Sequence, residues 1–137
     1  MNSPAVDIAN LLAANGFGTY ASTIFASRVP DSPDVVMVVS SVTAREPMLA
    51  TGKTAGTFLD TARPNVQVWL RDKAGQNAAG YNRAAAVRKF LHGKSSFIVN
   101  GTRYHSVFAL SDIGELGVDE KLRPVFSINF RMERSMT

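Results

Sequence analysis

The chain has 137 residues, of which 45% are hydrophobic and 19% charged, so it is expected to fold and not to stay disordered. Its net charge of +4 is too mild to indicate a nucleic-acid partner by itself. Cysteine is absent, which excludes disulfides, thiolate zinc sites and thiol nucleophiles. Residues 1–17 lack the basic leader of a signal peptide, and no apolar run is long enough for a membrane helix. We expect a soluble protein made inside a cell.

The first elements are a helix and two strands. Ser3 followed by Pro4 is typical of a helix start, and Asn15-Gly16 is typical of its end. A short strand is predicted over residues 18–26. Residues 34–40 are apolar on both faces, so we expect a central strand that is covered on each side.

Residues 41–64 show no clean hydrophobic period and contain two prolines and two glycines. They predict a long loop excursion from the sheet, and such loops are often functional. Gly52-Lys53 resembles the end of a phosphate-binding loop. The motif needs a glycine five positions earlier, but that position is occupied by Pro47, which has no N–H to donate. Nucleotide binding is therefore not expected.

A strand, a helix and a hairpin follow. Residues 66–71 alternate as a strand, and Asp72 is expected to cap a helix that runs to about His92 and presents an Ala- and Gly-rich side to the sheet. Asn100-Gly101 predicts a two-residue hairpin turn between residues 97–99 and 102–110.

The last strand has the clearest pattern in the chain. Apolar residues at 126, 128, 130 and 132 alternate with polar ones, which predicts one face on a core and one toward water or a partner. We interpret this strand as a sheet edge suited to assembly. The whole chain is predicted to form a single α+β domain over residues 1–137, with a mainly antiparallel, mixed sheet packed by two helices.

No catalytic, cofactor or metal site is predicted. The acidic cluster of residues 112–120 has Gly114 and Leu116 where a calcium loop needs oxygen ligands, and Arg123 where it needs glutamate. His92 and His105 fall on separate elements without an acidic partner at metal spacing. No nucleophile motif is present, so the protein is not expected to be an enzyme.

Two sets of charged residues are candidates for contacts. Arg45, Lys53 and Arg63 have no aromatic residues near them in sequence, so they would contact phosphates through charge and would not stack on bases. The second set comprises Asp119, Glu120 and Arg123.

Several motifs together resemble the tail terminator, or minor capsid, proteins of long-tailed (siphovirus-type) bacteriophages. They are the strand of residues 66–71 after Pro64, the Ala-rich helix ending at residues 90–93, and residues 116–130 with the charged run before the last strand. The N-terminal helix fits as well, whereas residues 41–63 match loosely.

The resemblance implies a subunit of a ring, usually a hexamer, at the head-proximal end of the tail. Such a ring would end growth of the tail tube, join the head connector (or neck protein), and let DNA pass through its lumen without sequence preference. Asp119, Glu120 and Arg123 would then lie between subunits, and Arg123→Glu would lower assembly while leaving the monomer folded. Arg45, Lys53 and Arg63 would face the lumen.

Two other functions fit the sequence. One is a neck or head-completion protein of the same particle, which would also form a ring. The other is a sequence-independent DNA-binding module that acts through the three basic residues. As a tail terminator or as a neck protein, the chain would be found in the virion, after assembly in the host cytoplasm. No membrane partner is expected.

Overall fold

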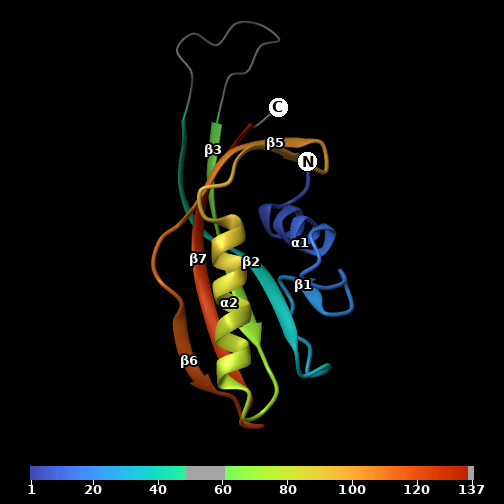
Figure 1. Ribbon diagram of the computed structural model, residues 1–137. Coiled ribbons are helices and arrows are strands. Elements are labelled where there is room, and N and C mark those ends of the chain that lie inside the picture. Colours follow the sequence, from blue (N-terminus) through green and yellow to red (C-terminus); the bar gives the residue numbers. More distant parts are fainter. Residues whose placement is uncertain (49–60, 136–137) are drawn as a thin grey trace, which may run out of the picture.

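The computed structural model describes residues 1–48 and 61–135, with residues 43–48 described as backbone alone. Within these residues, two helices and seven strands follow one another in sequence, and Figure 1 shows their arrangement. They are α1 (Pro4–Ala14), β1 (Ile24–Ala26), β2 (Val36–Met48), β3 (Thr61–Arg71), α2 (Asn77–Leu91), β4 (Ser95–Val99), β5 (Thr102–Ala109), β6 (Gly114–Val118) and β7 (Pro124–Ser135).

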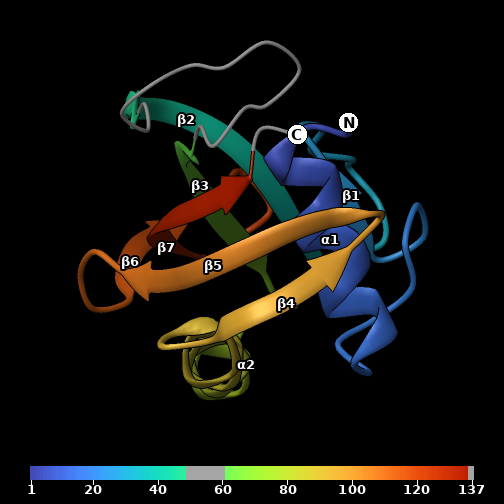
Figure 2. The same ribbon diagram turned by 90° about the horizontal axis from the view of Figure 1, so that it is seen from above.

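The strands form one mixed sheet in the order β1-β2-β3-β7-β5-β4, and β6 pairs with β7. β1 and β2 are parallel, and the other pairs of strands are antiparallel. Seen from above, the sheet curls and both helices lie on the same side of it (Figure 2). The predicted fold, α+β with a mainly antiparallel sheet and two helices, is confirmed.

The terminal strand supplies the centre of the core, as its alternation predicts. Phe126, Ile128, Phe130 and Met132 are all buried against the helices and the neighbouring strands. Its interpretation as a sheet edge is wrong, because β7 has β3 on one side and β5 and β6 on the other. Alternation reports which face of a strand is buried, whereas its neighbours within the sheet depend on distant segments.

β2 confirms the prediction of a central strand covered on both faces. Met37 and Val39 join the main core, while Val36 and Val38 form a second cluster with Phe25 on the opposite face. Two successive apolar residues can therefore both be buried although their side chains point in opposite directions.

The loop predicted over residues 41–64 is shorter than expected. β2 continues to Met48 and β3 begins at Thr61, so the two strands pair well into this region. Register shifts between Val42 and Arg45 and between Arg45 and Met48 interrupt the ladder. Such irregularities break the period of two on which strand prediction depends. Residues 49–60 lie outside the described residues.

The start predicted for α2 is also wrong. Helix α2 begins at Asn77, after a turn in which Gly75 has a φ of +80°, and no side chain caps it. Asp72 instead accepts a hydrogen bond from the Lys73 N–H and pairs with Arg83 at 3.3 Å. The helix packs very closely on the sheet, since a Cβ at Gly80 would lie 2.5 Å from the ring of Phe126.

The remaining local predictions have mixed outcomes. Ser3 caps α1 by accepting a hydrogen bond from the Val6 N–H, as expected. The hairpin turn is confirmed, with φ of 49° at Asn100 and 77° at Gly101. The strand predicted from residue 18 begins only at Ile24, because the Thr19 carbonyl accepts hydrogen bonds that close a turn over residues 19–24.

Candidate functional site

In the part of the chain that the structure describes, we looked first at the side chains that could bind a metal or take part in catalysis. Among them, no cluster of three or more His, Asp or Glu side chains could hold a metal ion. His92 caps α2, and its Nδ1 accepts a hydrogen bond of 2.9 Å from the Ala109 N–H. None of the helices described is long and apolar enough to cross a membrane. The features that remain are surfaces and charged clusters.

The first cluster surrounds Arg123, and we call it the tip cluster. The Arg123 side chain is only 6% exposed, although the residue lies in the turn between β6 and β7. It donates hydrogen bonds to Asp119 Oδ2 at 2.8 Å, to Asp34 Oδ1 at 3.1 Å and to the Asp31 carbonyl at 2.7 Å. The tip cluster comprises these four residues together with Arg71 and Lys121.

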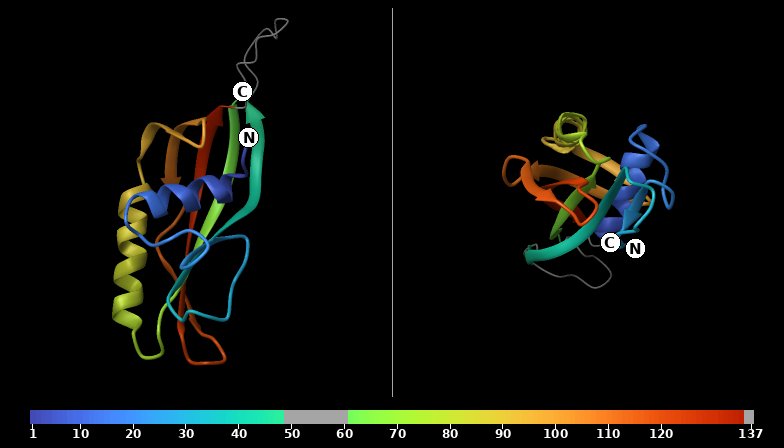
Figure 3. Two further views of the ribbon diagram at one scale, coloured as in Figure 1. Left: turned by 90° about the vertical axis from the view of Figure 1, so that its right-hand side faces the viewer. Right: turned by 90° about the horizontal axis from the view of Figure 1, so that it is seen from below.

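Arg71 and Lys121 complete the connection between two distant loops. Arg71 donates to the backbone carbonyls of Pro30, Asp31, Pro33 and Asp34, and so holds the loop before β2 in place. Lys121 pairs with Asp31 at 2.7 Å. This loop and the β6–β7 turn therefore lie together at one end of the molecule, away from the termini (Figure 3).

The ionisation of the cluster follows from these contacts. The hydrogen bond from Lys121 lowers the pKa of Asp31 below its ordinary value. Burial acts to raise the pKa of Asp119, but hydrogen bonds from Arg123 and Lys121 outweigh it, and the net shift is downward. Burial lowers the pKa of Arg71. The carboxylates of Asp31 and Asp119 are therefore held in their charged form by their partners.

Of the residues predicted to lie between subunits, Asp119 and Arg123 thus bind each other and their own chain. Glu120 is exposed and forms no ion pair within the described chain. Near it are three exposed apolar side chains, Leu116 (55%), Val118 (53%) and Leu122 (66%). Of the strands described, only β7 pairs with β6, so the other edge of β6 has no strand beside it. We call residues 114–122 the β6 segment.

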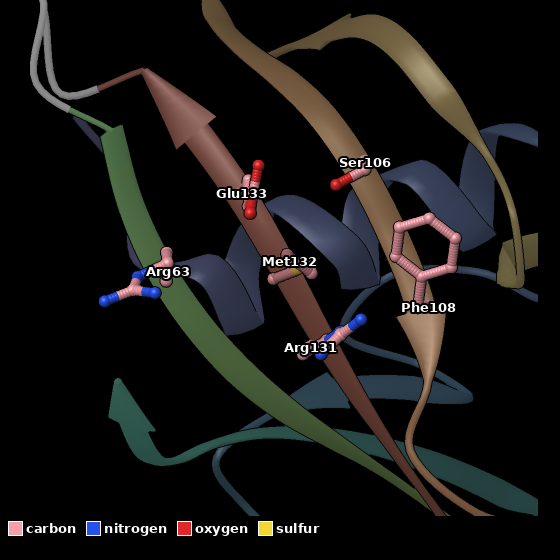
Figure 4. Close-up of a pocket in the computed structure, with 6 residues that line it drawn as sticks. All are labelled: Arg63, Ser106, Phe108, Arg131, Met132 and Glu133. Carbon is pink, nitrogen blue, oxygen red and sulfur yellow. The ribbon is translucent and has the colours of Figure 1, made fainter. Parts of the chain in front are cut away.

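A second feature, the arginine pocket, lies on the face of the sheet that the helices leave uncovered (Figure 4). It is a cavity of about 120 Å³ whose lining comes from three neighbouring strands: Arg63 of β3, Ser106 and Phe108 of β5, and Arg131, Met132 and Glu133 of β7. The Arg131 guanidinium lies 5.6 Å from the centre of the Phe108 ring, within cation–π range.

The lining of the pocket includes one of the three residues predicted to face a lumen. Arg63 lines it, the Cα of Arg45 on β2 is the register partner of Arg63, and Lys53 lies outside the described residues. Sequence reasoning missed Arg131 as a site residue. Its place in the polar row of the last strand was the available signal, but its meeting with Phe108 depends on the β5–β7 register.

A third cluster is buried where the first turn of α1 meets the C-terminal end of β7. Asp7 is fully buried and accepts hydrogen bonds from Tyr104 Oη at 2.6 Å and from the side-chain amide of Asn100 at 3.0 Å. Arg134 pairs with Asp7 at 3.5 Å. Burial raises the pKa of the Tyr104 hydroxyl, with a further contribution from Asp7. This cluster joins both ends of the chain to the β4–β5 hairpin.

The fold and its surfaces can be compared with known proteins. Residues 11–135 match the model of a family described as bacteriophage tail terminator protein. The chain belongs to this family. It is accordingly a structural protein of the phage tail, and the family is not a class of enzymes. Its place is therefore in the virion, and the resemblance seen in the sequence is confirmed.

Solved structures share the fold at low sequence identity. One is a chain from the virion of a native gene transfer agent particle, 20% identical over 90% of this chain and 84% of that chain, with a TM-score of 0.57. Another is 12% identical over 96% of this chain and 90% of that chain, with a TM-score of 0.55. Among curated proteins, none matches this tail terminator.

Proposed function

We propose that this tail terminator forms a ring of about six copies at the head-proximal end of the tail, where it ends tube polymerisation and joins the head connector. The family match over residues 11–135 is the observation that carries the proposal. The exposed apolar residues of the β6 segment support it, because three such side chains within one short segment offer apolar area that a neighbouring subunit can cover.

In this proposal the turn of residues 119–123 lies between subunits. Asp119 and Arg123 fix its shape through bonds within their own chain, and Glu120 and Leu122 are the side chains left to contact a neighbour. A turn that is already rigid loses little conformational entropy on assembly, which favours its use as a contact.

The lumen-facing role proposed for Arg45, Lys53 and Arg63 concerns DNA that passes through the ring. Contacts through charge alone would be weak, independent of sequence and sensitive to salt. Binding of duplex DNA to the assembled ring should therefore decrease steeply as the salt concentration rises. An affinity that does not change with salt would contradict this role.

The ring is tested by light scattering after gel filtration, with negative-stain images of any large species, in the absence and presence of purified tail tubes. A ring with an open lumen, formed alone or on tube ends, is the expected result. A protein that stays monomeric and leaves tube ends free would contradict the proposal. Binding to the connector but not to the tube would favour the neck-protein alternative, which the family match argues against. Assembly is proposed to occur in the host cytoplasm.

A further inference from the structure

The arginine pocket presents one exposed cation. Its lining includes the guanidinium groups of Arg63 and Arg131 and the carboxylate of Glu133. Arg131 is exposed, and among the described residues its only aromatic or charged contact is with the Phe108 ring. An exposed arginine within cation–π range of an aromatic ring is well suited to bind a carboxylate in two hydrogen bonds.

The pocket is built on rigid parts of the molecule. Arg131 and Phe108 are register partners on β7 and β5, and both strands lie inside the sheet. Ser106 is opposite Glu133 on the same two strands. The positions of these backbones are thus set by the ladder, and the pocket needs little rearrangement to bind a partner.

The β6 segment has the complementary chemistry. Glu115 is exposed and forms no ion pair within the described residues, and Val118 is 53% exposed. Their register partners on β7, Phe126 and Pro124, are two residues apart, so the two side chains lie on the same face of β6. The strand that carries them has one edge without a neighbouring strand in the part of the chain that is described. A carboxylate next to an aliphatic side chain matches a guanidinium next to an aromatic ring, in charge and in apolar character.

We infer that the β6 segment of one copy docks on the arginine pocket of the next, with Glu115 pairing with Arg131 and Val118 packing on Phe108. This inference rests on the proposed ring and names the two surfaces that would meet in it. Because the surfaces differ, the contact is heterologous, and a rotation that closes turns such contacts into a ring. DNA phosphate is the competing occupant of the pocket.

The first test reverses the charges. Arg131→Glu and Glu115→Arg should each lower the fraction of assembled protein by roughly tenfold, and the double variant should recover most of it. Arg103→Glu, which reverses an exposed arginine elsewhere on β5, is the matched control and should assemble normally. Normal assembly of both single variants, or a double variant as defective as the worse single one, would overturn the pairing. So would loss of DNA binding by Arg131→Glu with assembly intact.

The second test does not require a complete ring. The chain has no cysteine, so Phe108→Cys and Val118→Cys variants can be mixed under mild oxidation and examined for disulfide-linked dimers. The mixed pair should link at least about tenfold faster than Ile98→Cys with Val118→Cys, although Ile98 on β4 is more exposed (61%) than Phe108 (40%). Equal rates would overturn the docking even if rings form. Fast linking without rings would support the docking and contradict the ring.

Discussion

Arg123 directly precedes strand β7 and Arg131 lies in the middle of it, but the two side chains have opposite surroundings. Arg123 is buried and bonded to Asp31, Asp34 and Asp119, whereas Arg131 is exposed and rests on the ring of Phe108. A buried charge with several partners stabilises the chain that contains it, and its loss leaves those partners unpaired. An exposed charge without an ion pair contributes little to folding and remains available to another molecule. The comparison therefore separates residues that hold the monomer together from residues suited to assembly.

The largest expected effect is that of Arg123→Glu, which places a fourth carboxylate among three. We expect the monomer to melt roughly 10 °C lower or to fail to fold, because like charges would replace every ion pair of that side chain. Thermal unfolding followed by circular dichroism measures this. If Arg123→Glu does not fold, Arg123→Gln should still fold and should show a smaller decrease in melting temperature.

Arg103→Glu is the control for that experiment and should melt close to the unmodified protein. If Arg123→Glu melted normally and only assembly failed, Arg123 would be a contact residue between subunits, as the sequence alone suggests. The internal role would then be contradicted.

A moderate loss is expected from Tyr104→Phe in the buried Asp7 cluster. The variant removes a hydrogen bond of 2.6 Å and leaves a buried carboxylate with fewer donors. The free energy of unfolding should fall by about 1–3 kcal/mol, measured in urea. Tyr81→Phe, at a tyrosine that is 39% exposed, is the matched control and should change it little. Equal effects of the two variants would show that the Asp7 bond does not stabilise the fold.

These clusters show where sequence reasoning succeeds and where it stops. Asn100-Gly101 predicts its hairpin correctly, because the requirement for positive φ is local to the two residues. The charges near Arg123 are visible in sequence, but the partners Asp31 and Asp34 approach only through the fold. The strand order that places β7 between β3 and β5 is likewise set by distant segments. In the sequence Arg131 is therefore one member of a polar row, and nothing local to it indicates a pocket.

A smaller effect is expected from pH. The folded-state pKa values of Asp31 and Asp119 are lowered, so the unfolded chain binds more protons than the folded one as the pH falls. Their contribution to stability is complete above about pH 5 and is lost as the pH falls through the lowered values. Denaturation in urea from about pH 6 to pH 2 should show this decline.

Asp119→Asn tests the origin of that decline, because the variant cannot titrate at this position. Its stability should be lower near neutral pH and should fall less steeply in acid. A slope identical to that of the unmodified protein would assign the acid sensitivity to other carboxylates.

The smallest effect on the monomer is expected at Arg131. Arg131→Ala removes one exposed cation–π contact and no ion pair of the described chain, so the free energy of unfolding should change by less than about 1 kcal/mol. Assembly should nevertheless be weakened, because the guanidinium proposed to receive Glu115 of a neighbour is gone. Arg103→Ala is the matched control for both measurements. A loss of monomer stability as large as that of Tyr104→Phe would place Arg131 with Arg123 among the residues that maintain the fold. Unchanged stability with lost assembly is the result that only a contact residue can give.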